Sequence, residues 1–178
     1  MERLLSFAVA AVLGTSAPSQ GDDTRPLIVG AHTPAEERAI DALQQTLDAW
    51  LSAYSDYPET ERPVARILVV EPGYEFEHLG RMTVLGGTMR GAYASDTATI
   101  YLLRPWNAGR PRDQSVLLHE LVHHRQVDAK HWYCGQAMEW DAYKLQEEFL
   151  AAHGIDPEFH WTRILLESSC AVRDHHPG

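Results

Sequence analysis

The chain has 178 residues, of which 44% are hydrophobic and 22% charged, and this composition is typical of one globular domain with a single core. The formal net charge is −10, and the acidic residues are spread along the chain. This charge argues against nucleic acid or an anionic membrane surface as a partner.

The N-terminus is typical of a secretory signal peptide. Arg3 precedes an apolar run over residues 4–14, and small and polar residues follow up to Gly21. Because the run is too short to span a bilayer, we expect residues 1–21 to be removed and residues 22–178 to form one domain without a membrane span. The protein is then exported, to the periplasm or the medium. The alternative interpretation is a hydrophobic N-terminal helix of the domain itself.

The first helix of the domain is expected to begin after Thr33. Thr33 is suited to cap the helix, Pro34 to its first turn, and Glu36 to complete a capping box. Tyr57 and the proline after it end the helix. Apolar residues at helical spacing predict its core-facing stripe: Ile40, Leu43, Leu47, Trp50, Leu51 and Tyr54.

Strands are expected between this helix and residue 104. Residues 65–70 are apolar and β-branched, which is typical of a buried strand, and residues 82–85 form a second candidate. Residues 91–103 are interpreted as a hairpin with its turn near Ser95 and Asp96.

The next helix, expected from a cap at Asp113 to about Val127, carries the most informative motif of the chain, His119-Glu120-Leu121-Val122-His123. Residues four apart lie on one face of a helix, so the two imidazoles point the same way and can bind one metal ion. Glu120 projects beside them, where a carboxylate can polarise a metal-bound water. Leucines and a valine fill the opposite face, which indicates a core-packed helix.

A third ligand is expected on the following helix, predicted over residues 136–153. Glu139 stands near its start, and the intervening stretch is long enough for the chain to turn back. Two imidazoles and one carboxylate leave a fourth position open, as in catalytic zinc sites. Asp141 is the main competitor for the ligand role, and His124 and His131 are weaker ones.

A last helix is predicted over residues 156–168. Cys134 and Cys170 form an even pair in a protein expected to be exported, which favours a disulfide between the segment before Glu139 and the C-terminal segment. Buried free thiols are the alternative. His175 and His176, in the tail, are interpreted as solvated residues.

The motif, followed by Glu139 with Ala142 and Tyr143 three and four residues later, resembles the gluzincin group of zinc metallopeptidases. The block His-Glu-Leu-x-His-x-x-Gln, which ends at Gln126, is also similar to small secreted bacterial proteins of unknown function. The resemblance covers roughly residues 95–150. It departs at Tyr143, because many gluzincins carry there an aspartate that orients the first histidine.

This resemblance implies an α+β, zincin-like fold, with a small mixed sheet followed by a metal-site helix, a ligand helix and a C-terminal helix. It implies one Zn²⁺ per chain, held by His119, His123 and Glu139, and hydrolysis of a peptide or protein substrate with Glu120 as general base. It also implies an edge strand that pairs with the substrate, for which residues 97–103 are the candidate.

Tyr143 and Asp141 are candidates for orienting the ligands or stabilising a developing oxyanion. Three other readings stay open: a non-catalytic zincin-like metal-binding module of the cell envelope, a hydrolase of a non-peptide amide or ester, and a structural domain with a fortuitous motif. Iron, cobalt or manganese are alternatives to zinc. Further candidates for the oxyanion donor are His131, Tyr133, His160 and Arg163.

Overall fold

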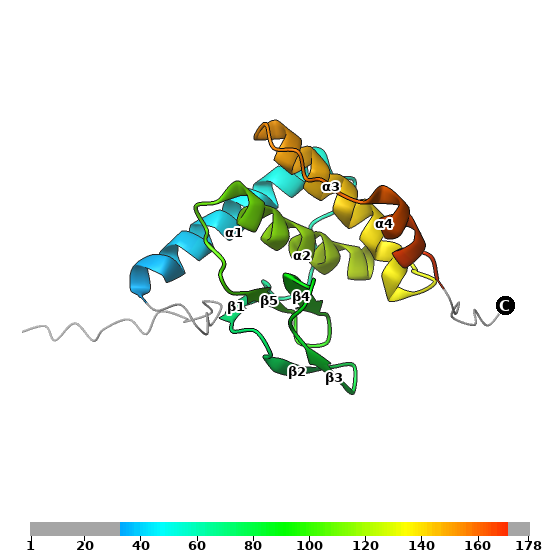
Figure 1. Ribbon diagram of the computed structural model, residues 1–178, viewed down its shortest axis with the longest axis horizontal. Coiled ribbons are helices and arrows are strands. Elements are labelled where there is room, and N and C mark those ends of the chain that lie inside the picture. Colours follow the sequence, from blue (N-terminus) through cyan, green and yellow to red (C-terminus); the bar gives the residue numbers. More distant parts are fainter. Residues whose placement is uncertain (1–32, 171–178) are drawn as a thin grey trace, which may run out of the picture.

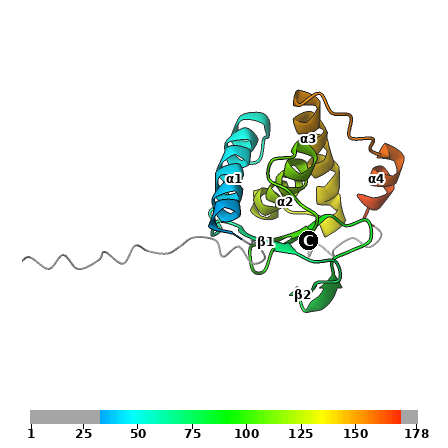
Figure 2. The same ribbon diagram turned by 60° about the vertical axis from the view of Figure 1, so that its left-hand side comes forward.

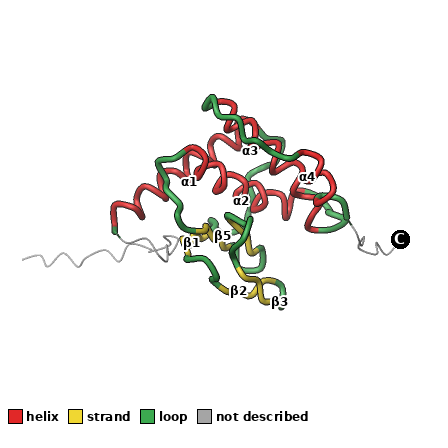
Figure 3. The backbone as a smooth tube through the Cα atoms, viewed as in Figure 1, coloured by secondary structure: helices red, strands yellow, loops and turns green. Residues whose placement is uncertain are grey.

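A computed structural model describes residues 33–170, in which helices and small sheets occupy separate layers (Figure 3). The predicted α+β class is therefore confirmed. Three long helices lie over one face of a three-stranded sheet, and a short helix lies at the end of the helical layer (Figures 1 and 2). The helices are α1 (Pro34–Tyr54), α2 (Pro111–Ala129), α3 (Glu139–Ala152) and α4 (Trp161–Glu167), with a 3₁₀ turn, η1 (Gly135–Met138), before α3.

The three-stranded sheet has the order β1-β5-β4. Its strands are β1 (Arg66–Val70), β5 (Thr99–Leu103) and β4 (Gly91–Ala94). β5 pairs in parallel with β1 and antiparallel with β4, so the predicted hairpin over residues 91–103 is confirmed. The prediction that residues 97–103 form an edge strand is wrong. All five residues of β5 are buried, which suits a central strand, and β4 is the edge.

A separate hairpin, β2 (Glu75–His78) with β3 (Arg81–Val84), packs on the sheet face opposite the helices (Figure 1). β3 is one residue displaced from the predicted strand. β2 was not predicted, because only Phe76 in it is buried. Alternate residues of a strand point to opposite faces. One face of β1 and β5 therefore packs on α2, and the other packs on the hairpin through Leu68, Val70, Tyr101, Leu103 and Phe76.

The first helix follows its sequence signals closely. The Thr33 hydroxyl accepts a hydrogen bond from the Glu36 amide at 3.2 Å, which confirms Thr33 as the cap, and it donates to the Glu36 carboxylate at 3.1 Å. Ile40, Leu47 and Leu51 are buried as predicted. Tyr54 is the exception: its side chain is 62% exposed because the helix ends there.

Three predicted helix starts are wrong. The helix predicted from residue 136 begins at Glu139, because the 3₁₀ turn η1 occupies the residues before it. Arg110, not Asp113, is the N-cap of α2, because Pro111 already occupies the first turn. The Asp113 carboxylate instead accepts a hydrogen bond from the Asn107 amide at 3.1 Å. The last helix begins at Trp161 rather than at residue 156: the Asp156 carboxylate accepts from the Glu158 amide, and Glu158 has a φ of 57°, which no helix allows.

The predicted signal peptide, residues 1–21, and the tail with His175 and His176 lie outside the described residues. Within residues 33–170, no helix is both long enough and apolar enough to cross a membrane.

Candidate metal site

His119, His123 and Glu139 converge from two helices, as the sequence predicts. The two histidines lie one turn apart on α2, and Glu139 is the first residue of α3. The two histidine Nε2 atoms are 3.1 Å apart. Glu139 Oε2 lies 3.1 Å from His119 Nε2, and its Oε1 lies 3.4 Å from His123 Nε2. The potential ligand atoms all lie within 4.8 Å of one another, so this cluster could hold a metal ion.

A buried glutamine sets the tautomer of His123. Gln126 Nε2 donates to the carbonyl oxygen of Met138 at 3.0 Å, and a carbonyl can only accept. Gln126 Oε1 therefore faces His123 Nδ1, 2.8 Å away, and this nitrogen carries the proton. When the imidazole is neutral, as a metal ligand must be, the lone pair of His123 is then on Nε2, toward Glu139. The same carboxamide joins α2 to the residue before Glu139, so it holds two predicted ligands in register.

A second glutamine does the same for His119. Ser115 Oγ donates to the Arg112 carbonyl at 2.8 Å, so this oxygen accepts from Gln146 Nε2 at 3.1 Å. Gln146 Oε1 consequently faces His119 Nδ1 at 3.2 Å, and Nδ1 is the protonated nitrogen. In their neutral forms, both imidazoles thus present Nε2 lone pairs to the same point. Such orienting partners are a regular feature of metal-binding histidines.

The donor set fits a small tetrahedral cation. Ligands about 2.0–2.1 Å from a tetrahedral ion lie roughly 3.3 Å apart, close to the spacing between these nitrogen and oxygen atoms. Burial by itself lowers the pKa of His123, but the hydrogen bond and charge of Glu139 outweigh it and raise the pKa to about 9. Burial likewise raises the pKa of Glu139, and its hydrogen bonds to both histidines reverse this and leave the pKa well below its usual range. The cluster therefore favours a positive charge at its centre.

Glu120 lies beside the cluster without a hydrogen bond from any described residue. Its side chain is almost fully buried, with a residue exposure of 5%. Burial raises its pKa, the charges of His119 and His123 lower it, and the charge of Glu139 raises it. A carboxylate held in this way is suited to accept a proton, because burial disfavours its charged form.

The cluster opens into a cleft of about 750 Å³. Its floor is formed by α2 and α3. One wall is made by β4 and the β2–β3 hairpin, and the other by α4 and the segment before it. Residues that line the walls include Phe76, Thr83, Gly91, Tyr143, Phe159, His160 and Arg163.

The competing ligand candidates lie elsewhere. The Asp141 carboxylate accepts a hydrogen bond from the Tyr57 hydroxyl and lies 3.8 Å from Lys130 Nζ. His124 Nδ1 is 2.8 Å from the Tyr93 hydroxyl on β4. His131 lies near Tyr133, with ring centroids 5.9 Å apart. None of these three belongs to the cluster that could hold a metal ion among residues 33–170.

Tyr143 is part of the cleft. Its ring meets His119 edge-on, with the ring centroids 4.6 Å apart. Burial raises the pKa of Tyr143, and the charges of Glu139 and Glu120 raise it further, so its hydroxyl stays protonated. The orienting bond expected from an aspartate at this position comes instead from Gln146, one turn further along α3. His160 and Arg163 also line the cleft, whereas His131 and Tyr133 do not.

The predicted disulfide is confirmed: Cys134 and Cys170 are bonded, with an S–S distance of 2.02 Å. Cys134 directly precedes η1, and Cys170 follows the end of α4. The bond therefore ties the segment leading into Glu139 to the helix that forms one cleft wall.

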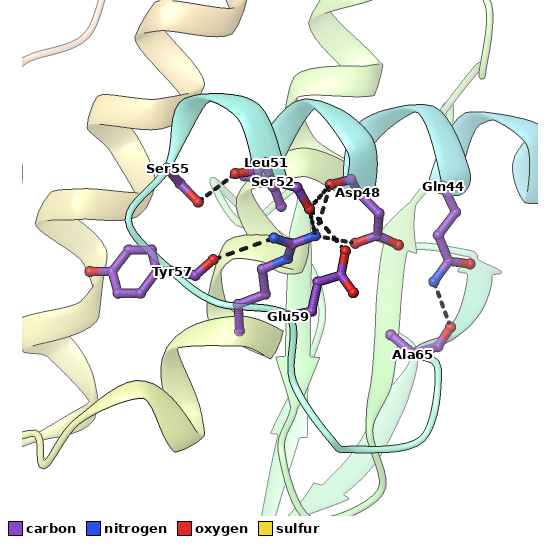
Figure 4. Close-up of polar contacts among 9 residues, drawn as sticks. Gln44, Asp48, Leu51, Ser52, Ser55, Tyr57, Glu59 and Ala65 are labelled. Carbon is purple, nitrogen blue, oxygen red and sulfur yellow. Dashed lines mark hydrogen bonds and ion pairs between the residues drawn. The ribbon is translucent and has the colours of Figure 1, made fainter.

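Arg125 anchors α2 behind the site. Its Nη2 donates to the Asp48 carbonyl at 2.7 Å and to Ser52 Oγ at 3.1 Å, and its Nη1 donates to the Tyr57 carbonyl at 3.4 Å. Figure 4 shows these partners on the last turns of α1 and the loop after it. Because Arg125 follows His123 by two residues, these bonds fix the rotation of α2 that aims the histidines at α3.

Three residues of the site were not predicted. The sequence could have indicated Gln126, because this residue ends the His-Glu-Leu-x-His-x-x-Gln block three residues after His123. Gln146 lies seven residues after Glu139, two turns along the same face of a helix. Gly91 lines the cleft beside Glu120, and nothing in the sequence around it predicts this position.

The fold and the cluster define an α+β protein with a two-histidine, one-glutamate site in an open cleft. Residues 35–178 match a family described as a domain of unknown function, DUF6647, and the chain belongs to that family. Neither a curated protein nor a solved structure matches the chain.

Proposed function

We propose that this protein is a zinc-dependent hydrolase, a zincin-like peptidase that cleaves peptide bonds. The observation that carries the proposal is the convergence of the two histidine Nε2 atoms with the Glu139 carboxylate, beside Glu120, in an open cleft. Two imidazoles and a carboxylate leave one position of a zinc ion open for water or substrate. Zinc bound by His119, His123 and Glu139 would supply Lewis acidity, which lowers the pKa of a coordinated water and polarises a carbonyl.

In this proposal Glu120 moves the proton. Its carboxylate takes a proton from the attacking water and later delivers it to the leaving amine. The burial that raises its pKa suits both steps, since the group must first accept and then release a proton near neutral pH. The Tyr143 hydroxyl is the proposed donor to the developing oxyanion, because it lines the cleft and remains protonated.

The edge strand β4 is the proposed site of substrate pairing. The Leu103 amide donates to the Arg90 carbonyl at 2.9 Å, which marks these two as a hydrogen-bonded pair between β5 and the start of β4. Such pairs alternate in antiparallel strands, so Gly91 and Tyr93 direct their amides and carbonyls away from β5. An extended peptide can pair with these groups in the manner of an added strand.

A non-catalytic metal-binding module of the cell envelope is the second candidate. The close approach of β4 to Glu120 favours it, because this residue is only 5% exposed and substrate access to it is restricted. For both candidate functions, the disulfide favours export of the protein to an oxidising compartment.

The proposal is tested by incubating the purified protein with a library of short peptides. We expect cleavage that stops when zinc is removed with a chelator and returns when zinc is added back. Magnesium added back in its place is the control, and it should not restore cleavage, because it prefers octahedral oxygen ligands. A protein that binds zinc tightly but cleaves no peptide in the library would support the non-catalytic module instead.

A further inference from the structure

Gly91 lies so close to α2 that a side chain at this position would force its neighbours to shift. A Cβ atom built on Gly91 would lie 2.7 Å from Glu120 Oε1, 3.1 Å from Glu120 Cγ and 3.0 Å from Val116 Cγ1. The φ angle of Gly91 is not positive, so its backbone suits any residue. Gly91 is therefore required here for space and not for conformational freedom.

The backbones on both sides resist a shift, so the side chains of Glu120 and Val116 must give way, and Glu120 makes the closest contact. β4 is held in register with β5, where Gly91 is opposite Leu102, a residue with no exposed surface. On α2, the neighbouring Leu117 and Leu121 are likewise fully buried in the core between helix and sheet. Close-packed interiors resist backbone shifts, so added volume at Gly91 displaces the Glu120 carboxylate.

We propose that Gly91 is a positioning residue for Glu120: the missing side chain on β4 creates the space in which the carboxylate lies beside the histidines. The inference rests on the proposed function for its catalytic consequence. Its steric part is independent of that function. The structure thus assigns to one glycine on the edge strand the placement of the proposed general base.

The steric part is tested with Gly91→Ala in two backgrounds, the natural sequence and Glu120→Ala. Denaturant midpoints of the metal-free proteins are measured for all four combinations, since such a cycle isolates the coupling between two residues. We expect Gly91→Ala to lower the midpoint clearly when Glu120 is present and much less with Glu120→Ala. Equal shifts in both backgrounds, or failure to fold in both, would overturn the inference, because Glu120 would then not limit the space.

The catalytic part is tested with the zinc-loaded protein, using Gly86→Ala as the matched control. The nearest atom to a Cβ at Gly86 is 3.9 Å away, which is ordinary van der Waals contact. We expect Gly91→Ala to bind zinc normally, to keep its KM and to lose kcat by about tenfold or more, while Gly86→Ala keeps both constants. An unchanged kcat would contradict the positioning role. If the protein cleaves no peptide at all, the stability cycle still decides whether Gly91 holds Glu120 in place.

Discussion

Glu120→Gln is expected to keep its metal and to lose kcat by a factor of about 10²–10⁴, the usual contribution of a general base. The variant has the shape of the natural side chain but no carboxylate to accept a proton. Metal content should not change, because His119, His123 and Glu139 form the cluster without Glu120. Initial rates with a cleaved peptide, measured beside the zinc content of the same sample, check both statements.

The control for this variant is Glu148→Gln, which makes the same change at an exposed position of α3. It should retain the natural rate. Glu120→Gln should also be at least as stable as the natural protein, since it removes a buried carboxylate that no described residue hydrogen-bonds. A Glu120→Gln variant that cleaves at the natural rate would show that another group moves the proton.

The Cys134→Ser variant is expected to lower the free energy of unfolding by about 4 kcal/mol, from the loop entropy that a disulfide removes from the unfolded chain. The bond closes a loop with a sequence separation of 36. Part of the lost stability should be local to the cleft wall formed by α4. Only Ile164 of this helix is buried, so the helix depends on the disulfide to stay in place. Denaturant unfolding gives the free energy directly.

Two controls separate the bond from the substitution itself. Ser169→Ala changes an exposed residue next to Cys170 and should leave stability nearly unaltered. Reductant should destabilise the natural protein as much as Cys134→Ser does, and it should have no further effect on the variant. A natural protein that unfolds at the same denaturant concentration with and without reductant would refute this role of the disulfide.

The sequence predicted those features that depend on local spacing. His119 and His123 share a helix face whatever the rest of the fold, and Thr33 caps its helix through a residue three positions away. Two consecutive helices joined by a short segment also predicted that the chain turns back and brings Glu139 close to the histidines. For these elements the pattern along the chain and the packing of the fold agree.

Features set by distant segments were missed. The parallel pairing of β1 with β5 makes residues 99–103 central, and nothing local distinguishes that from an edge strand. Gln146 orients His119 across 27 positions of sequence, through contact between α2 and α3. The space at Gly91 exists only because β4 lies against α2, so it required the tertiary structure.

Elemental analysis of the purified protein tests most directly whether His119, His123 and Glu139 hold a metal ion. The natural protein should be compared with Glu139→Ala, and with Glu148→Ala as an exposed control on the same helix. We predict about one zinc per chain in the natural protein and the control, and a loss or sharp weakening in Glu139→Ala. A natural protein without bound metal after zinc is supplied, or a Glu139→Ala variant with full zinc, would contradict the account.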